Sequence, residues 1–209
     1  MANFLEGLGS HLQGDTLSQM SRQLGADEDQ TRQAVSMALP MLLGGLAKEA
    51  ETPEGAQALN RALDEDHDGS LLDNVSALLG PATTGAADVA VPRSLNGAGI
   101  LSHVFGGKRE PVQQGIGRAT GLNGHQVARL LMMLAPLAMA YLGRQKRQAN
   151  AGPSEISAQL QTERKQLEQR APGFGDLLGS LFGGGGDRPG FADDLARMAP
   201  NVLGNLFGR

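Results

Sequence analysis

The feature that most constrains this chain is a helix-ending glycine that occurs twice, 96 residues apart, in the same local pattern. Gly25 and Gly121 each follow a short amphipathic segment, which predicts helices over about 16–24 and 111–120. Glycine takes the left-handed backbone of a helix C′ position without steric cost. Both helices are therefore expected to stop at these glycines.

Each glycine is followed by the residues that begin a second, apolar helix. Asp27 and Asn123 can cap this helix, and a glutamine three residues further on completes a capping-box-like pair. Pro40 and Pro136 then lie in the helix interior, where proline removes a backbone donor and should kink the helix. The sequence thus predicts two helix–glycine–helix hairpins with proline-kinked core helices, related by internal duplication.

The second apolar helix decides how the two hairpins must be arranged. Residues 130–143 hold no charged side chain over 14 positions. A bilayer span needs roughly 20 apolar residues, so we interpret this segment as a buried core helix and expect no membrane span. A helix that is apolar on most sides must be covered by other helices. The simplest arrangement is that the two copies cover each other.

Composition predicts an all-α fold. Aromatic residues make up 3% of the chain, helix formers such as Ala, Leu, Gln and Arg dominate, and β-branched runs are almost absent. The chain has no cysteine, which excludes disulfides, thiolate catalysis, iron–sulfur clusters and cysteine-based zinc sites. The first residues contain neither a basic stretch nor a long apolar one, so we expect no secretory signal and a cytoplasmic location.

Three parts of different character follow one another along the chain. Residues 1–148 form the duplicated multihelical domain, and residues 149–170 form an exposed amphipathic helix. Residues 171–209 form a flexible tail, in which ten of 39 residues are glycine. Within the first part, further helices are expected over 53–63, 70–79 and 97–105, with a loop over 81–94.

The tail also carries short apolar patches. Such patches can dock as helices on a protein partner or on another copy of the chain. Transient helices without a partner are the alternative. The candidate interaction residues in these patches are Leu181, Phe182, Leu206 and Phe207.

Charge is segregated along the chain. Residues 48–92 hold nine acidic and two basic residues, for a net charge of −7, and residues 93–147 hold eight basic residues and one acidic residue, for +7. Opposite charges can steer docking within one chain or between copies. Ordinary solvated faces are the alternative. The basic residues after the second apolar helix are candidate interaction residues: Arg144, Lys146 and Arg147.

Short motifs of mostly small residues keep a fixed order over residues 17–145: Leu42–Leu46, Thr52–Gly55, Asp66–Leu71, Gly97–Gly106, Met133–Pro136 and Tyr141–Gly143. In order and spacing they resemble the YidB-like family of bacterial proteins, domain of unknown function 937. The resemblance implies a compact, internally duplicated multihelical fold. It implies no activity, because the family has none securely assigned.

The acidic segment 64–75 has the spacing of an EF-hand-type calcium loop. Asp64, Asp66 and Asp68 stand at loop positions one, three and five, and a glycine at position six permits a sharp turn. A valine stands at position twelve, where the loop needs a bidentate glutamate. Only weak calcium binding is therefore expected, with Asp73 as a substitute ligand. The alternative is an acidic turn that caps the following helix.

The helix–glycine–helix pattern is also typical of helix-turn-helix proteins that bind DNA. In the first copy, Asp27, Glu28 and Asp29 stand at the start of the second helix, where they would repel phosphate. The second copy, with His125 and Arg129, is better suited. Nucleic-acid binding is thus an alternative function, but it is not favoured.

Motifs for catalysis are missing from the sequence. The four histidines are isolated, and no metalloprotease motif, nucleophile elbow or phosphate-binding loop occurs. We therefore expect no enzyme activity and no cofactor, and we identify no small-molecule substrate. The duplicated core, the segregated charge and the tail favour a non-enzymatic protein that self-associates or serves as a scaffold, with the tail docking on the partner.

Overall fold

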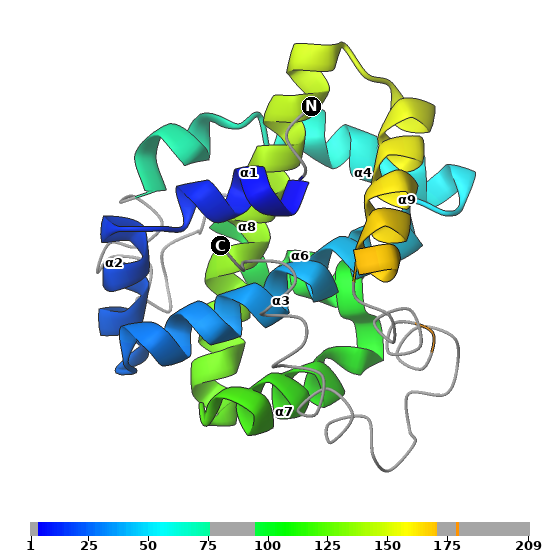
Figure 1. The fold of residues 1–209 in the computed structure, drawn as a ribbon. Helices are drawn as coiled ribbons and strands as arrows, with labels where there is room; N and C mark the ends of the chain where they lie inside the picture. The colour runs from blue at the N-terminus through cyan, green and yellow to red at the C-terminus, as the bar shows by residue number, and fades with distance from the viewer. Residues whose placement is uncertain (1–3, 76–94, 171–178, 180–209) are drawn as a thin grey trace.

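The computed structural model describes residues 4–75, 95–170 and 179, and these residues are mostly helical (Figure 1). The described residues contain no strand, so the predicted all-α class is confirmed. The elements follow in this order: α1 (Phe4–His11), α2 (Asp15–Leu24), α3 (Glu28–Glu49), α4 (Pro53–Glu65), the 3-10 helix η1 (Ser70–Asn74), α6 (Gly97–Phe105), the 3-10 helix η4 (Gly106–Lys108), α7 (Arg109–Thr120), α8 (Gly124–Ala149) and α9 (Pro153–Arg170).

The two long helices, α3 and α8, pack against each other at the centre of the molecule (Figure 1). Met37 and Met133, at matching positions of the predicted repeat, are both buried in one apolar cluster. The expected mutual burial of the two apolar helices is therefore confirmed. Pro40 and Pro136 lie inside these helices, each of which continues beyond its proline. The prolines do not end the helices, and the kink stays a prediction.

The local signals at the two hairpin turns act mostly as the sequence predicts. Gly25 and Gly121 follow α2 and α7 with φ of 62° and 77°, in the left-handed region. Asn123 forms a full capping box with Gln126 at the start of α8. Asp27 occupies the corresponding place before α3, but its side chain makes no capping hydrogen bond. Capping therefore differs between the two turns.

The helices of the two halves follow the same order, and their contacts are matched. α2 packs against α8 while α7 packs against α3, and α4 packs against α9. Gln126 Nε2 donates to the carbonyl oxygens of Leu24 at 3.1 Å and Gly25 at 3.3 Å. In the opposite direction, Gln30 of the first hairpin approaches the second turn: its Nε2 atom lies 3.3 Å from the position that a Cβ atom on Gly121 would occupy. The two turns thus contact each other reciprocally, while the duplication itself stays a prediction.

The helix predicted at the end of the domain is present, but its apolar face is covered rather than exposed. α9 packs against α3 and α4. Ser157 Oγ donates to the carbonyl oxygen of Ala50 at 2.6 Å, and Gln161 Nε2 donates to that of Ala47 at 2.7 Å. These bonds satisfy carbonyl groups at the C-terminal end of α3. The large apolar residues of α9 are at most 2% exposed: Ile156, Leu160 and Leu167.

The remaining helices agree with the sequence in part. α4 begins as predicted, with Thr52 Oγ1 accepting a hydrogen bond from the Gly55 amide. α6 has the predicted bounds. Where a helix was expected over 70–79, the structure shows the 3-10 helix η1. The rest of that prediction, the loop over 81–94 and the tail apart from Gly179 lie outside the described residues.

α8 is the one helix of the described residues that is long and apolar enough to cross a membrane. Of its most apolar 18-residue window, 78% is buried inside the protein. A buried core helix of a soluble protein can be as long and as apolar as a membrane-spanning helix. The absence of a span thus stays a prediction.

The covered face of α9 leads to a first prediction. Leu160→Ala should lower the free energy of unfolding by about 2–5 kcal/mol, because it leaves a cavity in the core beside α3 and α4. Urea unfolding followed by circular dichroism measures this change. The control is Gln166→Ala on the exposed face of the same helix, which should change stability by about 0.5 kcal/mol or less. Equal effects of the two substitutions would contradict the packing of α9.

Candidate functional site

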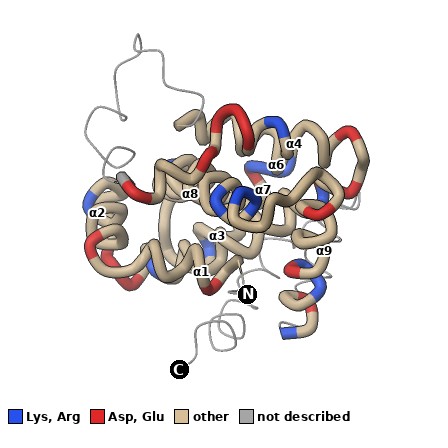
Figure 2. Tube along the Cα trace, turned by 90° about the horizontal axis from the view of Figure 1, so that it is seen from above, with Lys and Arg blue, Asp and Glu red and all other residues tan. Residues whose placement is uncertain are grey.

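The predicted calcium ligands and the predicted basic interaction residues meet where the turn after α4 lies on the end of α8. We call this region, residues 64–73 with 144–147, the acidic seam. Figure 2 shows acidic and basic positions interspersed over the described residues. The opposite charges of the two sequence segments thus meet within one chain. Three ion pairs join the acidic seam: Lys146 with Asp64, Arg147 with Asp68 at 3.2 Å, and Arg144 with Asp73 at 2.6 Å.

A close backbone approach fixes the acidic seam in place. A Cβ on Gly143 would lie 1.8 Å from the carbonyl oxygen of His67, so only glycine lets α8 and the turn come this near. Next to it, Arg144 Nη2 donates to the carbonyl oxygen of Gly69 at 2.9 Å. The backbone fit and the ion pairs therefore hold the same turn.

His67 is a buried titratable group within the acidic seam. The residue is 5% exposed, and its Nδ1 atom has no hydrogen-bond partner. Burial lowers the pKa of His67 below its ordinary value of 6.5, although the charges of Asp66 and Asp68 act in the opposite direction. Hydrogen bonds from Ser70, and then from Arg147, lower the pKa of Asp68. The folded protein therefore favours the neutral form of His67.

Three acidic side chains of the acidic seam are paired with basic ones. Within residues 4–75 and 95–170, no group of three or more acidic or histidine side chains is placed to hold a metal ion. Asp64, Asp68 and Asp73 each pair with a cation of α8 instead. Asp68 Oδ1 also accepts a hydrogen bond from the Ser70 amide at 2.9 Å. Asp68 thus accepts a backbone hydrogen bond at the start of η1, and weak calcium binding stays a prediction.

The turn before α8 makes several contacts within the fold. Asn123 and Gln126 hydrogen-bond each other's backbone amides, and the Gln126 side chain also bridges to the end of α2. His125 is exposed there, and Arg129 is half-buried. In the first hairpin, the exposed start of α3 carries Glu28, which accepts a hydrogen bond from Ser18. The described contacts do not favour a nucleic-acid interface.

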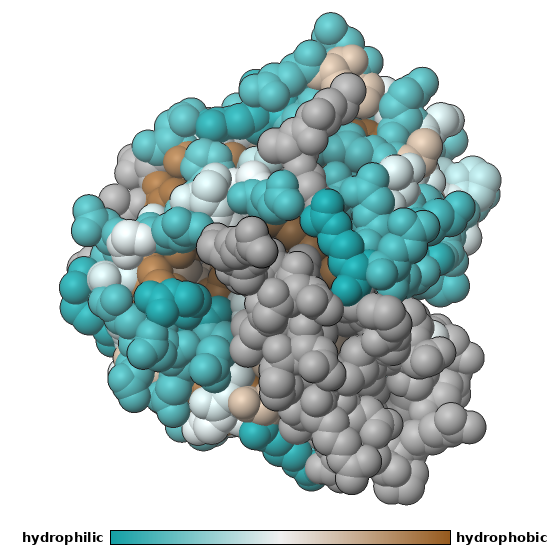
Figure 3. Space-filling view, in the orientation of Figure 1, coloured by the Kyte–Doolittle hydropathy of each residue, from teal (hydrophilic) through white to brown (hydrophobic). Residues whose placement is uncertain are grey.

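A second region, which the sequence did not predict, is a pocket of about 500 Å³ between α1, α2 and α3. We call it the α1–α3 pocket. Figure 3 shows hydrophobic residues in the hollow over these helices, surrounded by hydrophilic surface. Among the described residues that line it, the polar side chains are those of Gln13, Arg32, Gln33 and Ser36, and none is a carboxylate or a histidine. Its apolar lining comes from Leu12, Leu17, Val35 and Leu39.

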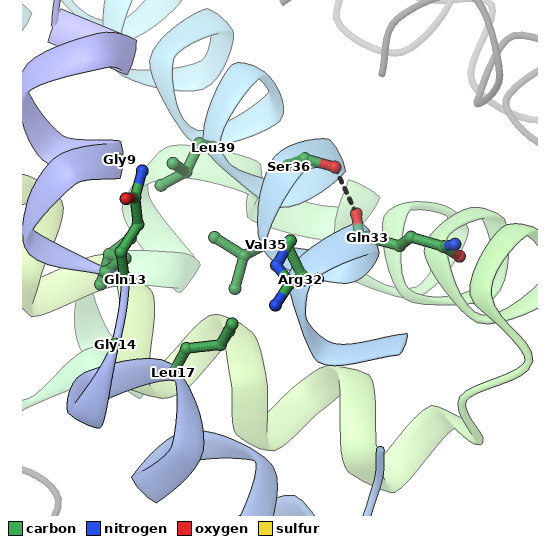
Figure 4. Close-up of a pocket in the computed structure, with 10 residues that line it drawn as sticks. Gly9, Gln13, Gly14, Leu17, Arg32, Gln33, Val35, Ser36 and Leu39 are labelled. Carbon is green, nitrogen blue, oxygen red and sulfur yellow. Dashed lines mark hydrogen bonds between the residues drawn. The ribbon is translucent and has the colours of Figure 1, made fainter. Parts of the chain in front are cut away.

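Side chains from two helices converge in the α1–α3 pocket. Figure 4 shows Val35 and Leu39 of α3 directed toward α1, while Leu17 of α2 reaches into the same space. Arg32 stands at the rim, where its side chain is 61% exposed and pairs with Asp29 at 2.6 Å. The pocket is thus an apolar hollow with an exposed cation at its edge.

In the second half of the chain, the corresponding helices lie close together. A Cβ on Gly97 of α6 would be 2.0 Å from the carbonyl oxygen of Met132 in α8. Arg109 Nη2 donates to the carbonyl oxygen of Ala98 at 3.1 Å and to Ser102 Oγ at 2.8 Å, which ties the start of α7 to α6. Among the described residues, α6 is thus held close against both α7 and α8.

Sequence reasoning missed α1 and, with it, the pocket. A signal for α1 is present, because Phe4, Leu8 and Leu12 recur every four residues, as on one face of a helix. The α3 wall shows no separate signal, since the spacing of Val35 and Leu39 is that of any buried helix face. The predicted tail residues lie outside the described residues: Leu181, Phe182, Leu206 and Phe207.

Comparison with known protein families matches residues 6–145 to DUF937, a bacterial protein family of unknown function. The matched region contains α3, most of α8 and all the residues that line the α1–α3 pocket. The chain belongs to DUF937. The resemblance carried by the short sequence motifs is thereby confirmed. No curated protein and no solved structure matches this DUF937 chain.

The close approach at Gly143 leads to a second prediction. Gly143→Ala should lower the free energy of unfolding by about 1–3 kcal/mol, because the new methyl group overlaps a backbone carbonyl that must then move. Gly124→Ala, at the start of the same helix, is the matched control, since nothing lies within 4 Å of its Cβ position. That variant should be neutral or more stable by up to about 1 kcal/mol. Urea unfolding compares the two, and a neutral Gly143→Ala would refute the close contact.

His67 leads to a third prediction. Its folded-state pKa is lowered, so the unfolded chain binds the proton more readily, and stability falls as pH drops below about 6.5 toward the folded pKa. The slope from this one group is at most about 1.4 kcal/mol per pH unit. His67→Gln removes the titration, so the difference in unfolding free energy between the two proteins should change between pH 7.5 and 5. A difference that is constant over this range would contradict the prediction.

Proposed function

We propose that this DUF937 protein is a non-enzymatic self-association protein, in which the α1–α3 pocket of one copy takes an apolar helical segment from the tail of another. The observation that carries the proposal is the pocket itself, an apolar hollow between helices at the molecular surface. Grooves of this kind bind the apolar face of an amphipathic helix through anchors spaced three or four residues apart.

The chemistry of the pocket lining supports binding rather than catalysis. General acid–base catalysis needs a carboxylate, histidine or similar group within reach of the reacting atoms. The pocket offers aliphatic side chains, two glutamines, a serine and an arginine. The serine, Ser36, donates to the carbonyl oxygen of Gln33 at 2.7 Å and has no histidine beside it in the pocket lining.

Charge complementarity supports the tail of a second copy as the occupant. Each of the two apolar tail segments, 176–182 and 194–207, begins with an aspartate. Arg32, at the rim of the pocket, carries an exposed charge of opposite sign, for which a tail aspartate would compete with Asp29, its partner at 2.6 Å. Pairing at the rim sets orientation, while the apolar side chains supply most of the binding free energy.

The proposal leads to a fourth prediction. Sedimentation velocity on the full chain over a range of concentrations should show reversible self-association. Arg32→Glu should raise the dissociation constant on the order of tenfold, which corresponds to about 1.4 kcal/mol. The matched control is Arg22→Glu, which makes the same charge change at an exposed position of α2 outside the pocket. A chain that stays monomeric at every concentration, or equal effects of the two variants, would overturn the proposal.

A further inference from the structure

The tail contains a segment that closely matches α1 in sequence. Aligned without gaps, Phe174–Phe182 and Phe4–Leu12 share phenylalanine at the first position and Leu-Gly-Ser at positions five to seven. Position three is acidic in both, and position nine is a large apolar residue in both. Six of the nine positions are therefore identical or conservatively replaced. This likeness predicts that the tail segment forms the same kind of helix as α1.

The structure shows what these shared positions do in α1. Phe4, Leu8 and Leu12 lie four residues apart and are 1%, 0% and 3% exposed. Phe4 and Leu8 belong to α1, which packs on α3 and α8, whereas Leu12 follows directly after the helix and lines the α1–α3 pocket. A tail helix with the same spacing also needs its apolar face to be covered, because an apolar stripe of this size is stable only when it is buried. Leu178 and Phe182 stand at the positions of Leu8 and Leu12.

The tail helix cannot simply take the place of α1. In α1, a Cβ on Gly7 would lie 1.7 Å from the hydroxyl oxygen of Tyr141. The tail has Leu177 at the matching position, so its side chain would collide with the tyrosine ring. The α1–α3 pocket beside α1 offers an apolar surface on α3 without this obstacle. The pocket is therefore the place that fits the segment.

The tail begins beside α1, which forms one side of this pocket. Arg170, the last residue of α9, pairs with Glu6 of α1 at 3.3 Å, and the Phe4 amide donates to Glu163 Oε1 at 3.1 Å. Gly9, one helical turn beyond Glu6, lines the pocket. Leu178 stands eight positions after Arg170. With residues 170–174 extended and 174–178 helical, the chain reaches about 20 Å. A short tether of this kind gives an effective concentration in the millimolar range.

We propose that Phe174–Phe182 docks in the α1–α3 pocket of its own chain, with Leu178 and Phe182 as the apolar anchors. This inference rests on the proposed function and adds its regulation: the same contact closes a monomer or, when exchanged between copies, joins two of them. Self-association then requires the tail to leave its own pocket.

Cross-linking of the full chain tests this proposal, because the protein has no cysteine of its own. Gln13→Cys places a thiol at the pocket, and Gly183→Cys places one directly after Phe182. A short bis-maleimide should join them within one chain about tenfold faster than it joins Gly183→Cys to Gln57→Cys, on the exposed surface of α4. Denaturing gel electrophoresis separates cross-linked monomers from dimers.

Two further experiments test the role of the apolar anchors and distinguish docking within one chain from docking between copies. Leu178→Asp with Phe182→Asp, in the chain that carries both cysteines, should reduce the fast cross-linking to the rate of the control pair. Mixtures of chains with one cysteine each report contacts between copies as dimers. Cross-linked monomers support the inference, and they do so even if sedimentation shows no self-association. Dimers alone overturn it while supporting the proposed function, and no cross-linking above the control also overturns it.

Discussion

The structure depends on the need to cover α8 on nearly every side. Leu130, Leu134 and Leu137 of this helix have no exposed surface. Since α8 is apolar around most of its circumference, no single partner can shield it, and it contacts α1, α2, α3, α4, α6 and α7 as well as η1. The shorter helices therefore surround α8, which lies at the centre of the molecule. The other long helix, α3, is the largest part of this covering.

The acidic seam shows how charge takes part in this arrangement without being its main source of stability. Ion pairs at a protein surface contribute about 0–1 kcal/mol each, because both charges are well hydrated when apart. Lys146 differs, since its side chain is only 11% exposed in its pair with Asp64. The pairs are better understood as a means of orientation. They align the turn after α4 with α8, so that the backbone of His67 meets the surface that Gly143 leaves open.

Features decided by neighbouring residues could be predicted from the sequence, and features decided by distant ones could not. Gly25 and Asn123 were assigned correctly because a left-handed glycine or a capping box involves only a few adjacent residues. The covered face of α9 could not be foreseen, since the residues that cover it lie in α3 and α4. The pocket depends on how far α1 lies from α3. Asp64, Asp68 and Asp73 have the spacing of calcium ligands, but the cations that meet them come from more than 70 residues away.

The region that matches the family and the region that packs together are different, because α9 packs on α3 but lies outside the matched residues. The shared family region ends at residue 145, inside α8, and begins at residue 6, inside α1. A fragment cut at those limits would lose the ring of Phe4, which meets Tyr141 edge-on with 5.4 Å between ring centres, and the side chains that cap the end of α3. A recombinant fragment designed for crystallisation should therefore follow the helices and not the alignment.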